Sequence, residues 1–332
     1  MDIRNVRELK GFAGERVGNI RDGKRIVLTY GAVALGLTLL VTVVNYVLGL
    51  QIDQLGGLRN LGMRKILSTV RTVLPMVQSM VAACLGLGFT AAMLRVARGQ
   101  YVSVNTLRLG FDRFWLLLRC TLFKGLLLTG AMMLAAYLGI MIYMMTPLSR
   151  NVMELLTPYV TEMTVMDSAL VLEEAVYDRF VAMLWPAYLI CGVLMLVLAV
   201  PMLYSYRMVN YIIIDKPGMG ALAALRESKK MMRYNRLDLF KLDVSMWWYY
   251  LATVGAMLIG YGDVLLPMLG VELPFSQDVG YFVFYGLYLA ATFGIYYFLL
   301  EKVEVTYGLA YDTLKPEEKQ DNGVVLGNIF QM

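Results

Sequence analysis

The chain reads FVAMLWPAYLICGVLMLVLAVPMLYSY over residues 180–206. This stretch contains no Asp, Glu, Lys or Arg, and a helix needs only about 20 predominantly apolar residues to cross the hydrocarbon core of a bilayer. Because that core offers no water to the backbone, a helix that satisfies its own N–H and C=O groups is the expected structure. The stretch therefore predicts a membrane-spanning helix, which Pro186 and Pro201 should kink or end.

Five further runs of the sequence are free of the same four charged residue types. Together the six charge-free runs cover residues 26–52, 72–94, 125–149, 180–206, 244–262 and 279–300. Within them we place the spans near 26–48, 73–94, 125–147, 180–204, 244–262 and 279–300. The expected fold class is all-α, a polytopic membrane helix bundle of about six transmembrane helices. The chain divides into a cytoplasmic N-terminal segment (1–25), a six-helix membrane domain (26–310) and a cytoplasmic tail (311–332).

The composition favours a membrane protein and argues against an enzyme. Hydrophobic residues make up 59% of the chain, charged residues only 17%, and the mean hydropathy is +0.61, whereas a soluble domain carries about 25% charged residues. Histidine, the commonest general base and metal ligand, is absent. Cys84, Cys120 and Cys191 lie apart in apolar surroundings, which indicates small buried side chains and no zinc or redox site. We expect no metal, no cofactor and no enzymatic activity, since phosphate-loop, HExxH and GxSxG motifs are also missing.

Basic residues set the expected orientation, because cytoplasmic segments of membrane proteins carry an excess of Lys and Arg. With both termini inside, the cytoplasmic segments hold 24 of the 30 basic residues and the outer connections hold 6. The weakest point is the first outer connection, residues 53–71, which carries four of those six. The first 25 residues are polar and no small-residue cleavage site follows them, so we expect the first run to stay as a helix and not to act as a signal peptide.

Two segments on the expected cytoplasmic side alternate charge and apolar bulk, which predicts amphipathic helices lying at the membrane surface. The first covers residues 101–124, and the second begins at Pro217, a residue type suited to the first turn of a helix. Their basic faces predict contacts with membrane lipids or other membrane proteins, and no contact with nucleic acid. The alternative is that these charges only enforce topology. The candidate contact residues are Arg108 and Arg113 in the first segment and Arg226, Lys229, Lys230 and Arg233 in the second.

The outer connection over residues 150–179 is acidic, with a net charge of −4. Such a loop can attract cations or a basic partner. We favour the simpler interpretation that acidic residues collect outside because basic ones are excluded there. The role of this connection stays open.

Small residues recur at four-residue spacing in the last two spans. Gly286, Ala290 and Gly294 form one stripe, and the fifth span carries another from Ala252 to Gly260. Small side chains let helix backbones approach closely where lipid supplies no hydrophobic drive for association. We favour packing within one chain over a dimerisation face.

One pattern resembles the paired YD and GxGD motifs of intramembrane aspartyl proteases. Tyr177-Asp178 supplies the first motif, and Gly260-Tyr261-Gly262-Asp263 supplies the second. Two carboxylates that share a proton could activate water. Both aspartates, however, fall at the outer ends of their predicted helices, where water keeps carboxylates ionised. No charged-residue signature of ion-coupled transport lies inside any of the six runs either.

The fourth connection carries a family resemblance. The stretch PMLYSYRM at 201–208, Tyr211, the tripeptide DKP at 215–217, ALRESKKMM at 224–232 and LFKL at 239–242 resemble a family of bacterial integral membrane proteins catalogued as domain of unknown function 975, as do Glu8-Leu9-Lys10 and Ala13. The family-pattern positions are Pro201, Tyr204, Tyr211, Asp215, Pro217, Ser228 and Phe240. The chain departs from the pattern at Tyr234-Asn235, where a glycine is usual, and its acidic outer loop is long.

The resemblance implies a multi-pass protein of the bacterial plasma (inner) membrane, and it brings no activity, substrate or catalytic residue. Our first hypothesis is therefore a non-enzymatic protein that organises the membrane, senses it or assists a partner through its cytoplasmic interfacial helices. The alternative is a permease or a lipid-translocating protein, suggested by the proline-kinked fourth span and the glycines of the fifth and sixth.

Overall fold

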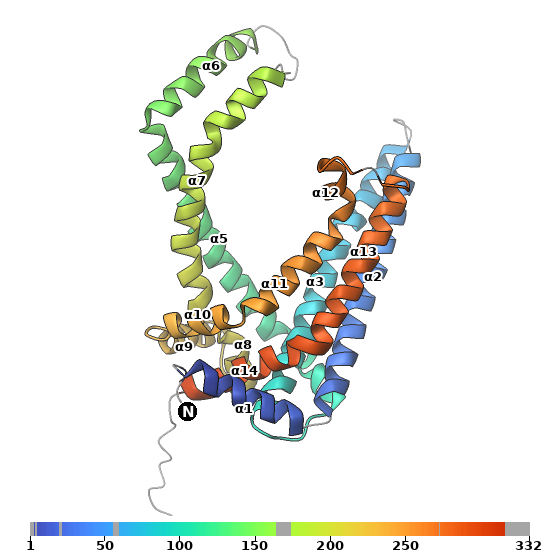
Figure 1. Ribbon diagram of the computed structural model, residues 1–332, viewed down its shortest axis with the longest axis vertical. Coiled ribbons are helices and arrows are strands. Elements are labelled where there is room, and N and C mark those ends of the chain that lie inside the picture. Colours follow the sequence, from blue (N-terminus) through green and yellow to red (C-terminus); the bar gives the residue numbers. More distant parts are fainter. Residues whose placement is uncertain are drawn as a thin grey trace, which may run out of the picture. The chain divides into compact units, whose positions relative to one another are not determined.

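The computed structural model describes residues 3, 5–19, 22–55, 60–163, 174–271 and 273–315. All regular elements in these ranges are helices and none is a strand, which confirms the all-α fold class (Figure 1). In chain order they are α1 (Val6–Asn19), α2 (Asp22–Gln54), α3 (Leu61–Ala97), the 3₁₀ helix η2 (Val104–Arg108), α4 (Leu109–Asp112), α5 (Phe114–Met144), α6 (Pro147–Met163), α7 (Glu174–Ser205), α8 (Val209–Asp215), α9 (Ala221–Met231), α10 (Arg236–Ser245), α11 (Trp247–Gly260), α12 (Gly262–Met268), α13 (Gln277–Ile295), the π-helical turn η3 (Tyr296–Leu300) and α14 (Glu301–Leu314).

Five helical stretches among the described residues are long and apolar enough to cross a membrane. They are Gly23–Gln54, Leu61–Ala97, Phe114–Met144, Arg179–Asp215 and Asp278–Leu314. A sixth is formed if α10 and α11, which meet at a bend of 63°, count as one broken span. The chain is therefore a multi-pass membrane protein. Each of the five long stretches covers all or most of one predicted run, whereas the run 244–262 does not form a single long helix.

The fifth predicted run is divided among three helices. α10 ends at Ser245, whose hydroxyl donates to the carbonyl of Leu242 at 2.6 Å, and the chain turns at Met246 before α11 begins. α11 has 14 residues, which at a rise of about 1.5 Å per residue is shorter than the hydrocarbon core of about 30 Å. A second turn at Tyr261, between two glycines, leads into α12. A charge-free run thus predicted the location of this span but not its breaks.

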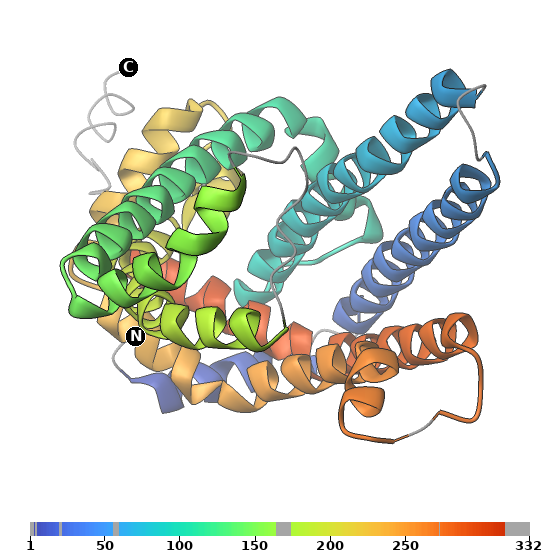
Figure 2. The ribbon, with the colours of Figure 1, turned by 90° about the horizontal axis from the view of Figure 1, so that it is seen from above.

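The contacts divide the chain into two compact units. Unit 1 contains residues 1–119 and 208–332, and unit 2 contains residues 120–207. In unit 1, α2 lies beside α3 (Figure 2), α11 packs on α13, and α14 packs on both α3 and α1. Its core is apolar and includes a stacked pair of rings, Tyr30 and Phe89, with centroids 4.4 Å apart. Unit 1 therefore joins helices from both ends of the sequence.

Unit 2 consists of α6, α7 and all but the first residues of α5. The Tyr143 hydroxyl donates to the Met183 carbonyl at 2.9 Å, which ties α5 to α7. A Cβ added to Gly139 would lie only 2.4 Å from the Cys191 sulfur. Gly139 therefore allows α5 and α7 to touch, and Cys191 fills the space beside it. Cys84 and Cys120 are buried, as expected for all three cysteines, whereas Cys191 is half-buried.

The predicted surface helix over residues 101–124 is not a single helix. η2 and α4 occupy 104–112, and α5 starts at Phe114 and runs without a break into the third span. The two short helices pack on α3 backbone to backbone, because a Cβ on Gly88 would lie 2.2 Å from the Leu107 carbonyl oxygen and one on Gly110 would lie 1.8 Å from that of Cys84. This close packing holds the segment against α3.

The second predicted segment does contain a helix, but the helix begins later than expected. α9 starts at Ala221, because Pro217 lies in a turn in which the Met219 N–H donates to the Lys216 carbonyl and Gly220 is extended. Its buried residues recur at helical spacing and leave the other face exposed. They are Ala221, Ala224, Leu225, Ser228 and Met231.

Three predicted loop segments also contain helix. The basic residues Arg64, Lys65 and Arg71 of the first outer connection belong to α3, while residues 56–59 lie outside the described part of the chain. In the acidic connection α6 extends to Met163, and residues 164–173 lie outside the described ranges. α14 continues to Leu314, so the predicted tail begins as helix, and residues from 316 on are not described.

Candidate functional site

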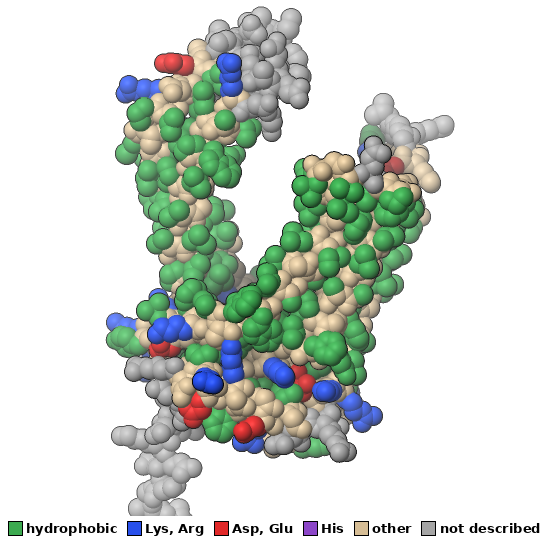
Figure 3. Space-filling view, viewed as in Figure 1, with side chains coloured by type: hydrophobic (Ala, Val, Ile, Leu, Met, Phe, Trp, Pro, Cys, Tyr) green, Lys and Arg blue, Asp and Glu red, His purple; other side chains and the backbone are tan. Residues whose placement is uncertain are grey.

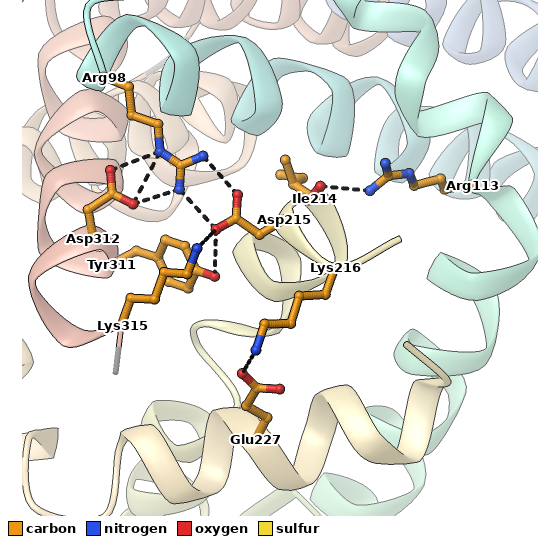
Figure 4. Close-up of polar contacts among 9 residues, drawn as sticks. All are labelled: Arg98, Arg113, Ile214, Asp215, Lys216, Glu227, Tyr311, Asp312 and Lys315. Carbon is orange, nitrogen blue, oxygen red and sulfur yellow. Dashed lines mark hydrogen bonds and ion pairs between the residues drawn. The ribbon is translucent and has the colours of Figure 1, made fainter. Parts of the chain in front are cut away.

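A network of charged side chains joins α3, α8 and α14 in unit 1 (Figure 4). At its centre is Arg98, the residue that follows α3. Its guanidinium donates from Nη1 and Nη2 to the two oxygens of Asp215 at 2.8 and 2.9 Å. The same guanidinium donates from Nε to Asp312 Oδ2 at 3.0 Å and from Nη2 to Asp312 Oδ1 at 2.6 Å. Paired hydrogen bonds of this kind fix both distance and orientation.

Asp215 accepts two further hydrogen bonds. Lys315 Nζ lies 3.1 Å and the Tyr311 hydroxyl 3.2 Å from its Oδ2. Tyr211, one helical turn before Asp215, stacks on the Tyr311 ring with centroids 5.3 Å apart. The carboxylate is therefore surrounded by donors although its side chain is only 9% exposed.

The network also shifts pKa values. Asp215 ends the stretch Arg179–Asp215, but it lies in α8, nine residues past Tyr206, where the charge-free run ends, and so outside the apolar segment that crosses the hydrocarbon core. Burial alone would raise the pKa of its carboxyl, but the hydrogen bonds from Arg98 and Lys315 outweigh burial and lower that pKa to about 2. The hydrogen bonds to Asp312 and Asp215 raise the pKa of Arg98. Both groups stay charged at neutral pH, which suits a structural ion-pair network.

Two more contacts fix α8 and attach it to its neighbours. Arg113 donates to the carbonyls of Ile213 and Ile214, with 2.9 Å to the latter, and so caps the C-terminal end of α8. Lys216 pairs with Glu227 of α9 at 2.8 Å. We call the whole set the charged hub. Its members are Arg98, Arg113, Tyr211, Asp215, Lys216, Glu227, Tyr311, Asp312 and Lys315.

The exposed side of α9 carries the predicted basic residues. Arg226, Lys229, Lys230 and, just after the helix, Arg233 are all exposed, and we call them the α9 basic face. No ion pair within the described ranges involves any of the four; Arg233 lies over the Tyr234 ring at 5.5 Å from its centroid. Lys and Arg gather around α9 and α10 in Figure 3. The Lys216–Glu227 pair thus orients α9. The four cations of the α9 basic face have no acidic partner among the described residues.

The other predicted residues fall into three groups. Arg108 is exposed at the end of η2, whereas half-buried Arg113 belongs to the charged hub. Of the family-pattern positions, Tyr211 and Asp215 are in the hub, Ser228 is on the buried side of α9, Pro217 and Phe240 are exposed, and Pro201 and Tyr204 lie in α7 of unit 2. In the stripe of α13, no described atom lies within 4 Å of a Cβ placed on Gly286 or Gly294, and Ala290 is exposed.

The stripe of the fifth span packs closely. Ala256 is buried in α11, and a Cβ on Gly260 would lie 3.2 Å from the Cβ of Tyr288 in α13. The stripe of α11 therefore packs against α13 within the chain. For Gly286, Ala290 and Gly294, packing against another helix stays a prediction.

Of the two protease-like aspartates, Asp263 is the one whose side chain the structure describes. Asp263 lies in the first turn of α12 and lines a pocket of about 510 Å³ together with Arg71 and Asp278. The side chains of Tyr177 and Asp178 lie outside the described residues. Among the residues that are described, no group of three or more His, Cys, Asp or Glu could hold a metal ion.

Long apolar helices and a charged hub joined by ion pairs within the chain define a polytopic helical membrane protein. Residues 25–317 match the family described as a protein of unknown function (DUF975), and the chain belongs to that family. No curated protein and no solved structure matches the chain.

Proposed function

We propose that the chain is a non-enzymatic protein of the bacterial plasma membrane that organises or assists a partner, or senses the bilayer, through the α9 basic face. The arrangement of α9 is the observation that supports this proposal. Its apolar side packs into unit 1 and Glu227 binds Lys216, whereas Arg226, Lys229 and Lys230 are exposed. A helix held in this way offers cations to anionic headgroups or an acidic partner without breaking a protein contact first.

The proposal includes an orientation. The α9 basic face and both termini are cytoplasmic, because this arrangement puts 24 of the 30 basic residues inside. The cytoplasmic leaflet carries the anionic lipids that the basic face would bind.

Charge removal tests the proposal. The triple variant Lys229→Gln, Lys230→Gln, Arg233→Gln should bind short-chain phosphatidylglycerol more weakly than the wild type in neutral detergent. Each cation near an anionic surface contributes about 1 kcal/mol, so the loss should approach 100-fold in Kd and shrink as salt is added. Isothermal titration or native mass spectrometry measures it.

Lys241→Gln is the matched control, because Lys241 is 69% exposed but already pairs with Asp238 at 3.2 Å. It should leave the affinity nearly unchanged. Equal binding of phosphatidylglycerol by the triple variant and the wild type, together with an unchanged set of co-purifying proteins, would refute the proposed role.

A permease or lipid-translocating protein is the second candidate. α11 is too short to cross the bilayer by itself, and a pocket of about 390 Å³ lies where it meets α13, lined by Gly260, Tyr285 and Tyr288 among others. An opening beside a broken span is a suitable place for a substrate to cross. Proteoliposomes that move a fluorescent lipid between leaflets, and lose this activity when Val264→Trp narrows the pocket from its partly exposed lining, would favour this function over the first.

A further inference from the structure

A buried carboxylate in unit 1 lies apart from the charged hub. Glu301 is the first residue of α14, follows the π-helical turn η3 directly, and is only 3% exposed. Its Oε1 has no hydrogen-bond partner. Such a group is costly to bury, and π-helical turns within a helix are frequent at functional sites. Both features indicate that Glu301 serves a purpose other than folding.

The start of α2 closes one side of this carboxylate. A Cβ on Gly23 would lie only 2.1 Å from Glu301 Oε1, so the missing side chain of residue 23 leaves the space that the carboxylate occupies. This proximity brings Lys24, the next residue, to the same place.

The carboxylate lines a pocket of about 570 Å³, which falls within the size range of small-molecule sites. Its described lining residues are Gly14, Val17, Gly18, Lys24, Tyr297, Phe298, Glu301 and Lys302. Lys24 Nζ lies 5.9 Å from the centre of the Tyr297 ring. In the described part of the chain neither lysine forms an ion pair with Glu301. The pocket thus combines two cations and one buried anion that do not neutralise one another by direct contact.

The pocket lies where two apolar runs end. Lys24 comes just before the charge-free run 26–52, and Glu301 comes just after the run 279–300. The two runs are neighbours there, since the rings of Tyr30 and Tyr296 are 5.9 Å apart. Phe298, on the wall of the pocket, is 69% exposed. Charged and aromatic residues at the end of a span lie at the level of lipid headgroups.

We propose that this pocket binds the headgroup of an aminophospholipid of the phosphatidylethanolamine type. The phosphate lies between Lys24 and Lys302, the primary ammonium donates to Glu301, and the acyl chains run along Phe298. Each charge of the pocket requires the opposite charge on the ligand: a phosphate alone would leave Glu301 without a donor, and an amine or metal ion alone would face two lysines. The site shares no residue with the α9 basic face, so this inference goes beyond the proposed function and stands or fails independently of it.

Headgroup selectivity tests the proposal on the full-length purified protein. Short-chain phosphatidylethanolamine should bind about tenfold more tightly than short-chain phosphatidylcholine, because a quaternary ammonium has no N–H to donate to Glu301 and a hydrogen bond to a charged group is lost. Glu301→Gln should remove this preference, while Lys24→Gln should weaken the binding of both lipids. Lys229→Gln on α9 should leave the preference intact and is the matched control.

Equal affinity of the wild type for the two lipids, or an unchanged preference in Glu301→Gln, would overturn the proposal. Competition identifies the ligand further. Soluble phosphoethanolamine should displace the bound lipid, and displacement by inorganic phosphate at the same concentration would instead show a simple phosphate site. The thermal unfolding of each variant is followed in parallel, and the comparison of two lipids on the unaltered protein needs no variant at all.

Discussion

Arg98 binds carboxylates from two helices with a single guanidinium. Replacing it by Gln would leave Asp215 and Asp312 without their shared cation, although Lys315 would still bind Asp215. We expect Arg98→Gln to lower the free energy of unfolding by about 2 to 3 kcal/mol, because partly buried carboxylates would lose charge-assisted hydrogen bonds. Thermal unfolding in detergent measures the loss. Arg226→Gln is the control on an exposed arginine, and equal stability of the two variants would show that the hub is not structural.

Asp215 gives the hub a pH dependence. Its folded-state pKa of about 2 lies below the ordinary value of 3.8. The carboxylate therefore stabilises the fold above its unfolded pKa, and this contribution is lost as the pH falls from about 4 towards 2. We expect the unfolding temperature of the wild type to fall more steeply across this window than that of Asp215→Asn. Parallel pH profiles of the two proteins would contradict the assignment.

The sequence could indicate some hub residues and not others. Tyr211 and Asp215 were singled out by the family pattern, and Arg113 by its place in a basic segment. Arg98 and Asp312 were missed, because their contacts join residues 117 and 214 positions apart in the chain, and a single sequence carries no signal for pairs that only the tertiary fold brings together. Position in the sequence gives no sign of Arg98 either, because the first charge after the run 72–94 is Arg95.

Two glycines of α3, Gly86 and Gly88, have different surroundings. A Cβ on Gly88 would meet the backbone of Leu107, whereas one on Gly86, two residues earlier, would meet nothing within 4 Å. We expect Gly88→Ala to separate η2 from α3 and to destabilise the protein by about 1 to 3 kcal/mol. Gly86→Ala should be neutral or slightly stabilising, since Ala favours helix by about 1 kcal/mol over Gly. Unfolding temperatures compare the two, and equal effects would argue against the backbone contact.

The sequence predicted helices correctly where a local pattern of apolar residues marks them. It did not predict the breaks and boundaries that depend on contacts with other helices. Apolar spacing identified α9, but Pro217 did not start it, because the glycines that follow favour a turn. The segment 101–124 has the composition of a surface helix, yet glycine contacts with α3 divide it at Arg113. Absence of charge located the fifth span, but it could not show that turns at Met246 and Tyr261 would break it.

In unit 1, the helix before the first charge-free run contacts the helix after the last one. α1 precedes the first charge-free run, α14 follows the last one, and these helices pack on each other. α1 also reaches the break between α10 and α11, where Lys10 Nζ donates to the Ser245 carbonyl. We expect these two helices, which are in contact beyond the charge-free runs 26–52 and 279–300, to lie on the same side of the bilayer, and this expectation requires an even number of crossings. Five spans alone would not satisfy this condition, which argues that the bent pair α10 and α11 crosses as the sixth.

Cysteine labelling tests this parity and the proposed orientation together. In a background without the three native cysteines, Arg7→Cys in α1 and Lys302→Cys in α14 should react alike with a membrane-impermeant maleimide, only after the cells are permeabilised. Met153→Cys in α6, an exposed residue of the expected outer connection, should react in intact cells. Opposite behaviour of Arg7→Cys and Lys302→Cys would mean an odd number of crossings and would make α11 a re-entrant segment. Labelling of both in intact cells would instead keep six crossings and place the α9 basic face outside, away from the anionic inner leaflet that its proposed role requires.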